Sequence, residues 1–139
     1  MRPARIVLAT LGCAAIGTAC PSPDCACPPA LSTAVVTVMV TASGQPLPGA
    51  GVTIQQLGSP TCADTSGTPL HISAIGITPG SGILSQTIVS PLSGEACIRA
   101  LARRSQGQLT DSALSEPAIL DFRFEGSKPD SVLLVVAFP

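Results

Sequence analysis

Aromatic and charged residues are scarce in this sequence. Its 139 residues contain no Trp, no Tyr and three Phe, and 11% of the residues are charged. Intrinsically disordered chains combine high charge with low hydrophobicity, whereas the hydrophobic fraction here is 45%. Disorder of the whole chain is therefore excluded, and the length predicts about one folded domain. The aromatic platforms that are usual at sugar-stacking sites and tight protein interfaces are also missing.

Basic clusters and cofactor motifs are missing as well. The formal net charge is -1, and Lys and Arg cluster no further than Arg103-Arg104, which excludes the electrostatic footprint of a nucleic-acid-binding protein. A metal site at Cys25-Ala26-Cys27 lacks further ligands, because His71 is the only histidine. The glycines from Gly76 to Gly82 lack the lysine and helix of a phosphate loop. We therefore expect no nucleic-acid partner, no metal and no cofactor.

Two arrangements have the residue types of a catalytic site. The sequence Asp64-Thr65-Ser66-Gly67 is close to an aspartic-protease loop, but Ser66 interrupts it and the chain has no second such loop. Because Asp, Ser and Gly are common in turns, a turn is the better interpretation. His71 with Asp64 and either Ser66 or Ser73 has the composition of a nucleophilic triad but lacks a nucleophile-elbow motif. We therefore expect a protein that is not an enzyme.

The N-terminus has the pattern of a secretory signal peptide over residues 1–19. Arg2 and Arg5 precede the uncharged run Ile6–Ile16, and Gly17-Thr18-Ala19 are small residues directly before Cys20. The apolar run has about 11 residues, whereas a membrane-spanning helix needs roughly 20. The pattern therefore predicts a cleaved signal rather than a permanent transmembrane anchor.

The segment Ile16–Cys20 resembles a bacterial lipoprotein signal, in which small residues precede a cysteine that receives diacylglycerol. The resemblance implies that Cys20 is lipidated and becomes the mature N-terminus. Gly17 stands where that family usually has Leu, so cleavage by a type I signal peptidase is the alternative. Pro21 differs from the Asp associated with inner-membrane retention, which implies the outer membrane in a Gram-negative host. The expected location is extracytoplasmic, with a membrane anchor formed by the lipid.

The next segment and the cysteines fit an exported protein. Residues 20–33 form a Pro- and Cys-rich tether, since prolines favour extended backbone. Of six cysteines, Cys13 lies in the signal and Cys20 carries the lipid, which leaves an even number for an oxidising compartment. A bridge between Cys62 and Cys97 is expected to stabilise the domain by up to roughly 4 kcal/mol. For Cys25 and Cys27, a second bridge and mixed pairing with the domain both remain open.

Alternation with a period of two predicts an all-β domain over residues 34–139. Ala34–Thr41 places Val36, Val38 and Val40 on one face, and Val52 and Ile54 continue the pattern after a turn of Gly and Pro. Such short, punctuated strands are typical of a β-sandwich or small barrel. The other expected strands are Leu70–Ile77, Ile83–Val89, Glu95–Arg104, Ala118–Phe124 and Val132–Phe138, of which Glu95–Arg104 has helix as its alternative.

Two of these strands carry more specific expectations. In Ala118–Phe124, alternation predicts that Leu120, Phe122 and Phe124 are buried and that Asp121, Arg123 and Glu125 face solvent. Val132–Phe138 has no polar member, which predicts a central strand covered on both faces, with Phe138 packing near the terminus.

The stretch from Val36 to Ile54, VTVMVTASGQPLPGAGVTI, resembles the opening of carboxypeptidase regulatory-like domains, with a strand, a Gly-x-Pro-Leu-Pro-Gly-Ala turn and a second strand. The family is similar in fold to transthyretin. The resemblance implies a single Greek-key β-sandwich of about seven strands that acts as an accessory module on an exported protein.

Two classes of function are compatible with the sequence. The first is a non-enzymatic cell-envelope lipoprotein with a structural or protein-interaction role, whose partners are the membrane, through the lipid, and an envelope protein or glycan. The alternative is a surface lipoprotein that binds a small ligand or carbohydrate in a concave pocket. Arg99, Arg103 and Arg104 would bind an anionic glycan or lipid head group if they shared one sheet face, and otherwise belong to the solvated surface.

Overall fold

The computed structural model describes residues 30–90, 93–124 and 126–139. Over these ranges the protein is all-β. No helix in the described part of the chain is long and apolar enough to span a membrane. The predicted signal peptide, Cys20, Cys25, Cys27 and all but the last residues of the tether lie outside the described residues, as does Glu125.

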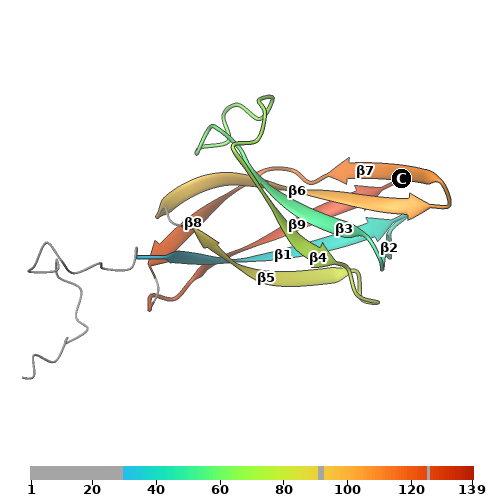
Figure 1. Ribbon diagram of the computed structural model, residues 1–139, viewed down its shortest axis with the longest axis horizontal. Coiled ribbons are helices and arrows are strands. Elements are labelled where there is room, and N and C mark those ends of the chain that lie inside the picture. Colours follow the sequence, from blue (N-terminus) through green and yellow to red (C-terminus); the bar gives the residue numbers. More distant parts are fainter. Residues whose placement is uncertain (1–29, 91–92, 125) are drawn as a thin grey trace, which may run out of the picture.

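Nine strands form one sheet that curls over on itself (Figure 1). Hydrogen bonding follows the order β2-β1-β8-β6-β3-β4, with β5 and β9 also paired to β1 and β7 paired to β6. Only the β1–β9 pair is parallel among the pairs of the described strands. The strands are β1 (Ser32–Ala42), β2 (Gln45–Pro46), β3 (Gly51–Gln56), β4 (His71–Ile77), β5 (Ile83–Ser90), β6 (Gly94–Gln106), β7 (Leu109–Leu114), β8 (Ala118–Phe124) and β9 (Asp130–Phe138).

The core is mostly aliphatic and lies between the two halves of the curled sheet. One half is built on β1 with β5 and β9, and the other is built on β3 and β6 with β4 and β7. Alternate residues of β1 point inward as predicted, and Val36, Val38 and Val40 are fully buried. Buried residues of β3, β6, β8 and β9 extend the core, namely Val52, Ile54, Ile98, Ala100, Ala102, Leu120, Phe122, Leu134, Val136 and Phe138.

Strand β8 joins the two halves. Its residues Ala118–Phe122 pair with the first part of β6, and Arg123 and Phe124 pair with the start of β1. Leu120 and Phe122 are buried as predicted, but Phe124 is 54% exposed, so its predicted burial is wrong. Phe124 is the last residue of β8 and pairs with Ser32 at the start of β1. It lies on the same face of β8 as Leu120 and Phe122 but beyond the end of the core.

Strand β9 corrects a second expectation. It pairs with β1 along its full length, and its outer face is open, with Leu133 55% and Val135 49% exposed. The prediction of a central strand covered on both faces is therefore wrong, because an all-apolar run does not distinguish a covered strand from one that lies at an edge. Phe138 is buried at the chain terminus, as predicted.

Strand β6 settles the one ambiguous segment in favour of a strand. Ile98, Ala100 and Ala102 point into the core, which gives this segment the period of two that a helix would not show. The sequence analysis missed β7, which pairs with the second part of β6 after a turn at Gly107. Its sequence, LTDSAL, is half polar and almost entirely exposed, and it has no hydrophobic alternation that would indicate a strand.

The turn between β2 and β3 and the turn between β4 and β5 lie together at one end of the sheet and contact each other through Thr78 and Gly82. The Thr78 hydroxyl donates a hydrogen bond to the Leu47 carbonyl (2.7 Å) and accepts one from the Ala50 N–H (3.0 Å). Gly82 has a φ of +69°, and its carbonyl accepts a hydrogen bond from the Val40 N–H at 2.8 Å. A Cβ on Gly82 would lie 2.7 Å from the Val40 carbonyl oxygen, which is backbone and unable to move away.

We expect Gly82→Ala to destabilise the domain by about 2–3 kcal/mol. The substitution combines an unfavourable positive φ with overpacking against backbone atoms. Thermal unfolding measures the effect, and Gly80→Ala is the matched control, because a Cβ on Gly80 meets nothing within 4 Å. Equal melting temperatures for the two variants would contradict the close packing at Gly82.

Candidate functional site

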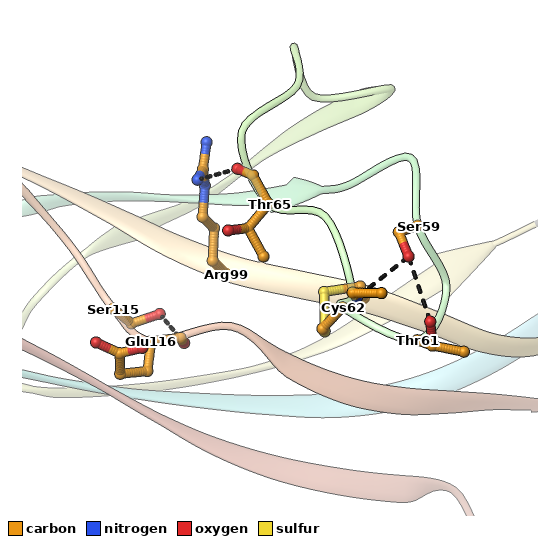
Figure 2. Close-up of a disulfide and its surroundings, with 9 residues drawn as sticks. Ser59, Thr61, Cys62, Thr65, Arg99, Ser115 and Glu116 are labelled. Atoms are coloured by element: carbon orange, nitrogen blue, oxygen red, sulfur yellow. Dashed lines mark hydrogen bonds between the residues drawn. A yellow bond between two sulfur atoms is a disulfide. The ribbon is translucent and has the colours of Figure 1, made fainter.

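The segment between β3 and β4 is fastened to the outer face of β6 by a disulfide (Figure 2). Cys62 and Cys97 are joined as predicted, with their Cα atoms 5.2 Å apart. Cys97 is fully buried although it lies on the face of β6 opposite the core. The bridge therefore ties this segment to β6 at a buried cysteine.

Arg99 fastens the same segment at a second point. Its Nε donates to Gln55 Oε1 at 2.8 Å. Its Nη1 donates to the Thr65 carbonyl at 3.1 Å, as Figure 2 shows. Both bonds are intramolecular, and Arg99 and Gln55 are largely buried. The guanidinium of Arg99 thus links β6, β3 and the loop.

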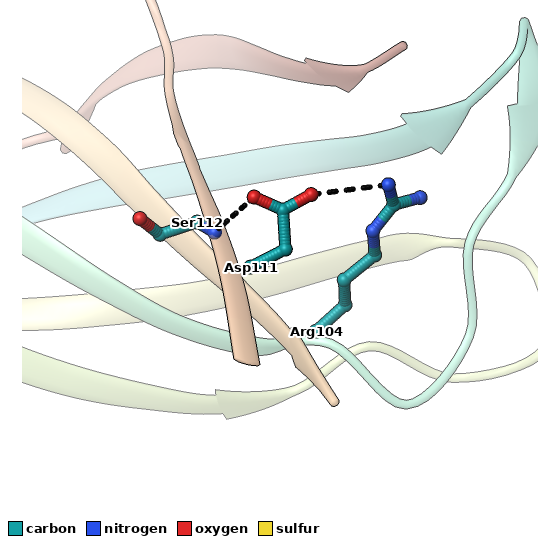
Figure 3. Close-up of polar contacts among 3 residues, drawn as sticks. All are labelled: Arg104, Asp111 and Ser112. Atoms are coloured by element: carbon teal, nitrogen blue, oxygen red, sulfur yellow. Dashed lines mark hydrogen bonds and ion pairs between the residues drawn. The ribbon is translucent and has the colours of Figure 1, made fainter. Parts of the chain in front are cut away.

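The three arginines of β6 do not share one face of the strand. Arg99 and Arg103 alternate with the core residues, whereas Arg104 follows Ala100 and Ala102 on the inward-facing side. Arg104 forms an ion pair with Asp111 at 3.1 Å (Figure 3), and its guanidinium carbon lies 4.5 Å from the centre of the Phe138 ring. The shared basic face that an anionic glycan or lipid head group would need is therefore not formed by these residues.

The catalytic candidates form two separate hydrogen-bonded pairs. Asp64 Oδ1 accepts hydrogen bonds from the Ser66 hydroxyl at 2.7 Å and from the Ser66 N–H at 3.0 Å, which makes the predicted turn. These bonds lower the pKa of Asp64, the hydroxyl having the larger effect, so the carboxyl stays ionised. His71 Nε2 lies 3.0 Å from the Ser73 hydroxyl on β4. Asp64 and His71 therefore bind different serines.

A cleft of about 280 Å³ lies between the beginning of β4 and the end of β5. Phe122 of β8 contributes an aromatic ring that is otherwise buried in the core. The remaining lining residues are Gln56 at the end of β3, Leu70 and His71 at the start of β4, and Ile88, Val89 and Ser90 at the end of β5.

The cleft offers an apolar surface with a few polar groups. Leu70 is 70% exposed and Val89 is 55% exposed, so two large apolar side chains are open to solvent at its rim. Gln56, His71 and Ser90 supply hydrogen-bonding groups, and the lining includes no Asp, Glu, Lys or Arg. A cleft slightly below the usual range of about 300–1,000 Å³ for ligand pockets suits a narrow occupant.

This site was not predicted from the sequence, in which His71 was only a member of a candidate nucleophilic triad. The lining comes from four strand ends that are distant in sequence, so no local motif marks it. Comparisons with protein-family models, curated proteins and solved structures find no match to this chain.

Proposed function

We propose that this protein is a non-enzymatic, lipid-anchored protein of the cell envelope whose β-domain has a structural or protein-interaction role. The observation that carries the proposal is the bridge between Cys62 and Cys97, because structural disulfides persist in oxidising, extracytoplasmic compartments. The signal-like pattern before Cys20 supports the same compartment and supplies an anchor.

We infer further that the domain is a Greek-key β-sandwich of the carboxypeptidase regulatory-like type. The support is the strand, turn and strand of Val36–Ile54, in which Gly44 and Gly49 adopt positive φ at the turn. The two sheet halves that face each other across one core also fit this architecture.

Protein interaction is the role that the cleft favours over carbohydrate binding. The chain has no Trp or Tyr on which a sugar ring would stack, and the cleft is mostly apolar. Exposed apolar side chains around it, such as Leu70 and Ile72, are a feature of surfaces that bind other macromolecules.

Changing the lipid acceptor tests the anchor. We expect Cys20→Ala to leave the membrane fraction and to lose metabolic labelling by palmitate, because two or more acyl chains are needed for stable membrane binding. Membrane fractionation and labelling measure both effects. Cys13→Ala is the control, since Cys13 lies within the apolar run of the predicted signal.

Unchanged palmitate labelling of the Cys20→Ala protein would overturn the assignment of Cys20. Mass spectrometry of the mature protein separates the two kinds of processing. A modified Cys20 at the N-terminus supports lipidation, whereas an unmodified terminus supports type I cleavage and contradicts the lipid anchor.

A further inference from the structure

The curled sheet is open along the line between β4 and β5. These strands are the outer members of the two halves, since β4 pairs only with β3 and β5 only with β1 among the described strands. Figure 1 shows them approaching each other near the loop that joins them and diverging toward their other ends. The cleft lies at the wide end of this opening, between Leu70-His71 and Ile88–Ser90.

Strand β5 presents the more regular of the two edges. It pairs with β1 from Ser90 to Ile83 without a shift of register. Strand β4 has a register shift opposite Val52 and Thr53, and its Gly76 has a φ of +136°. Because bulges and irregularities hinder edge pairing, β5 is better suited than β4 to accept an additional strand.

The edges also lack the charges that usually protect a free strand. Natural proteins discourage edge pairing with charged side chains, Lys above all. From residue 25 to residue 94 the only charged residue is Asp64, so neither β4 nor β5 carries a formal charge with His71 neutral. Most charged residues of the domain lie instead between Glu95 and Asp130. An uncharged strand would therefore meet no unpaired charge on this side of the molecule.

We propose that the opening between β4 and β5 binds an extended, uncharged peptide segment of another protein, which adds as a strand to the outer edge of β5. The proposal rests on the protein-interaction role proposed above and names the chemistry of the partner. Backbone hydrogen bonds along β5 would hold the segment, and its alternate apolar side chains would enter the cleft beside Ile88 and Phe122.

A peptide fits the opening better than the other occupants. An acyl chain would fill the apolar cleft but would leave the N–H and C=O groups of the β5 edge without partners. The Pro-rich tether of the chain itself lies close in sequence to β1, but its prolines lack the N–H groups that a ladder needs. A second copy of the chain is the remaining alternative and is distinguished by the molecular mass in solution.

Peptide binding to the full chain carrying Cys20→Ala tests the proposal without lipid or detergent. The probe is a blocked, fluorescent peptide with the sequence of residues 83–90, which is uncharged and has a strand pattern. We expect saturable binding by fluorescence anisotropy. The control peptide has proline in place of the residues copied from Gln86 and Ile88 and should not bind, because it lacks the corresponding N–H donors.

One substitution on the protein locates the site. Gln86 is exposed and lies on the same face of β5 as Ile88, so Gln86→Lys places an inward-pointing charge at the position that the added strand would cover. We expect it to weaken peptide binding at least about tenfold, because the new charge would be covered by the added strand. Thr110→Lys, at an exposed position of β7, is the matched control and should keep the dissociation constant within about twofold.

Three results would overturn the proposal. The first is failure of the peptide to bind, and the second is binding of the proline peptide with the same dissociation constant. The third is equal weakening of peptide binding by Gln86→Lys and Thr110→Lys. Light scattering that finds a dimer of the protein alone, which Gln86→Lys converts to a monomer, would identify a second copy as the occupant instead. Palmitate labelling tests the lipid anchor separately, so failure of the peptide-binding proposal is distinguished from failure of the proposed anchor.

Discussion

Ending the chain after Pro129 is expected to abolish cooperative unfolding of the domain. The truncation removes β9, which supplies Leu134, Val136 and Phe138 to the core and pairs with β1 from Ala34 to Ala42. Full burial of each large apolar side chain is worth about 1.5–3 kcal/mol, so their sum is comparable with a native stability of about 5–15 kcal/mol. Circular dichroism during heating should show no sharp transition.

Deletion of Pro139 alone is the control for this truncation. Pro139 is exposed and follows the last residue of β9, so the melting temperature should stay close to that of the full chain. A truncated protein that still unfolds cooperatively would show that β9 contributes less to the core than its buried side chains indicate.

Replacing both Cys62 and Cys97 by Ala is expected to lower the stability of the domain by roughly 4 kcal/mol. The two residues are 35 positions apart, so the bridge restricts a long loop in the unfolded chain. A loss of this size should lower the melting temperature by about 15 °C or more for a domain of this length. Urea unfolding of the non-reduced proteins measures the free energy directly.

The pair Cys25→Ala with Cys27→Ala provides the comparison. These residues precede the domain, and their replacement is expected to leave the melting temperature almost unchanged. Mass spectrometry of the non-reduced protein should recover a peptide that joins Cys62 to Cys97. Recovery of both as free thiols, or equal stability of the Cys62→Ala, Cys97→Ala protein, would contradict the stabilising role of the bridge.

Strands with strong alternation were predictable from the sequence. Ala118–Phe124 has the predicted bounds, Ile83–Val89 is extended by one residue, and Ala34–Thr41 is extended by two residues at its start and one at its end. These segments are rich in β-branched or aromatic residues, which favour strands. Short β2 and polar β7 were missed because backbone pairing after a turn, rather than side-chain burial, defines them.

The candidate site was beyond what the sequence indicates. Its residues become neighbours only because β4 and β5 are edge strands that approach each other in the curled sheet. The expected positions of Phe124 and of the outer face of β9 were wrong for a related reason. Hydrophobicity alone does not show which strand lies at the edge of a sheet or where the core ends.

The parallel pairing of β1 with β9 has a consequence for how the protein folds. The first and last strands of the domain are neighbours over Ala34–Ala42 and Asp130–Phe138, so this pairing spans almost the whole sequence of the domain. Contacts between residues so distant in sequence slow folding, because a long loop must close before they form. A chain that emerges N-terminus first therefore leaves one side of β1 without its partner until β9 has emerged. Such a topology delays completion of the core, because β9 is the last of the described strands to become available.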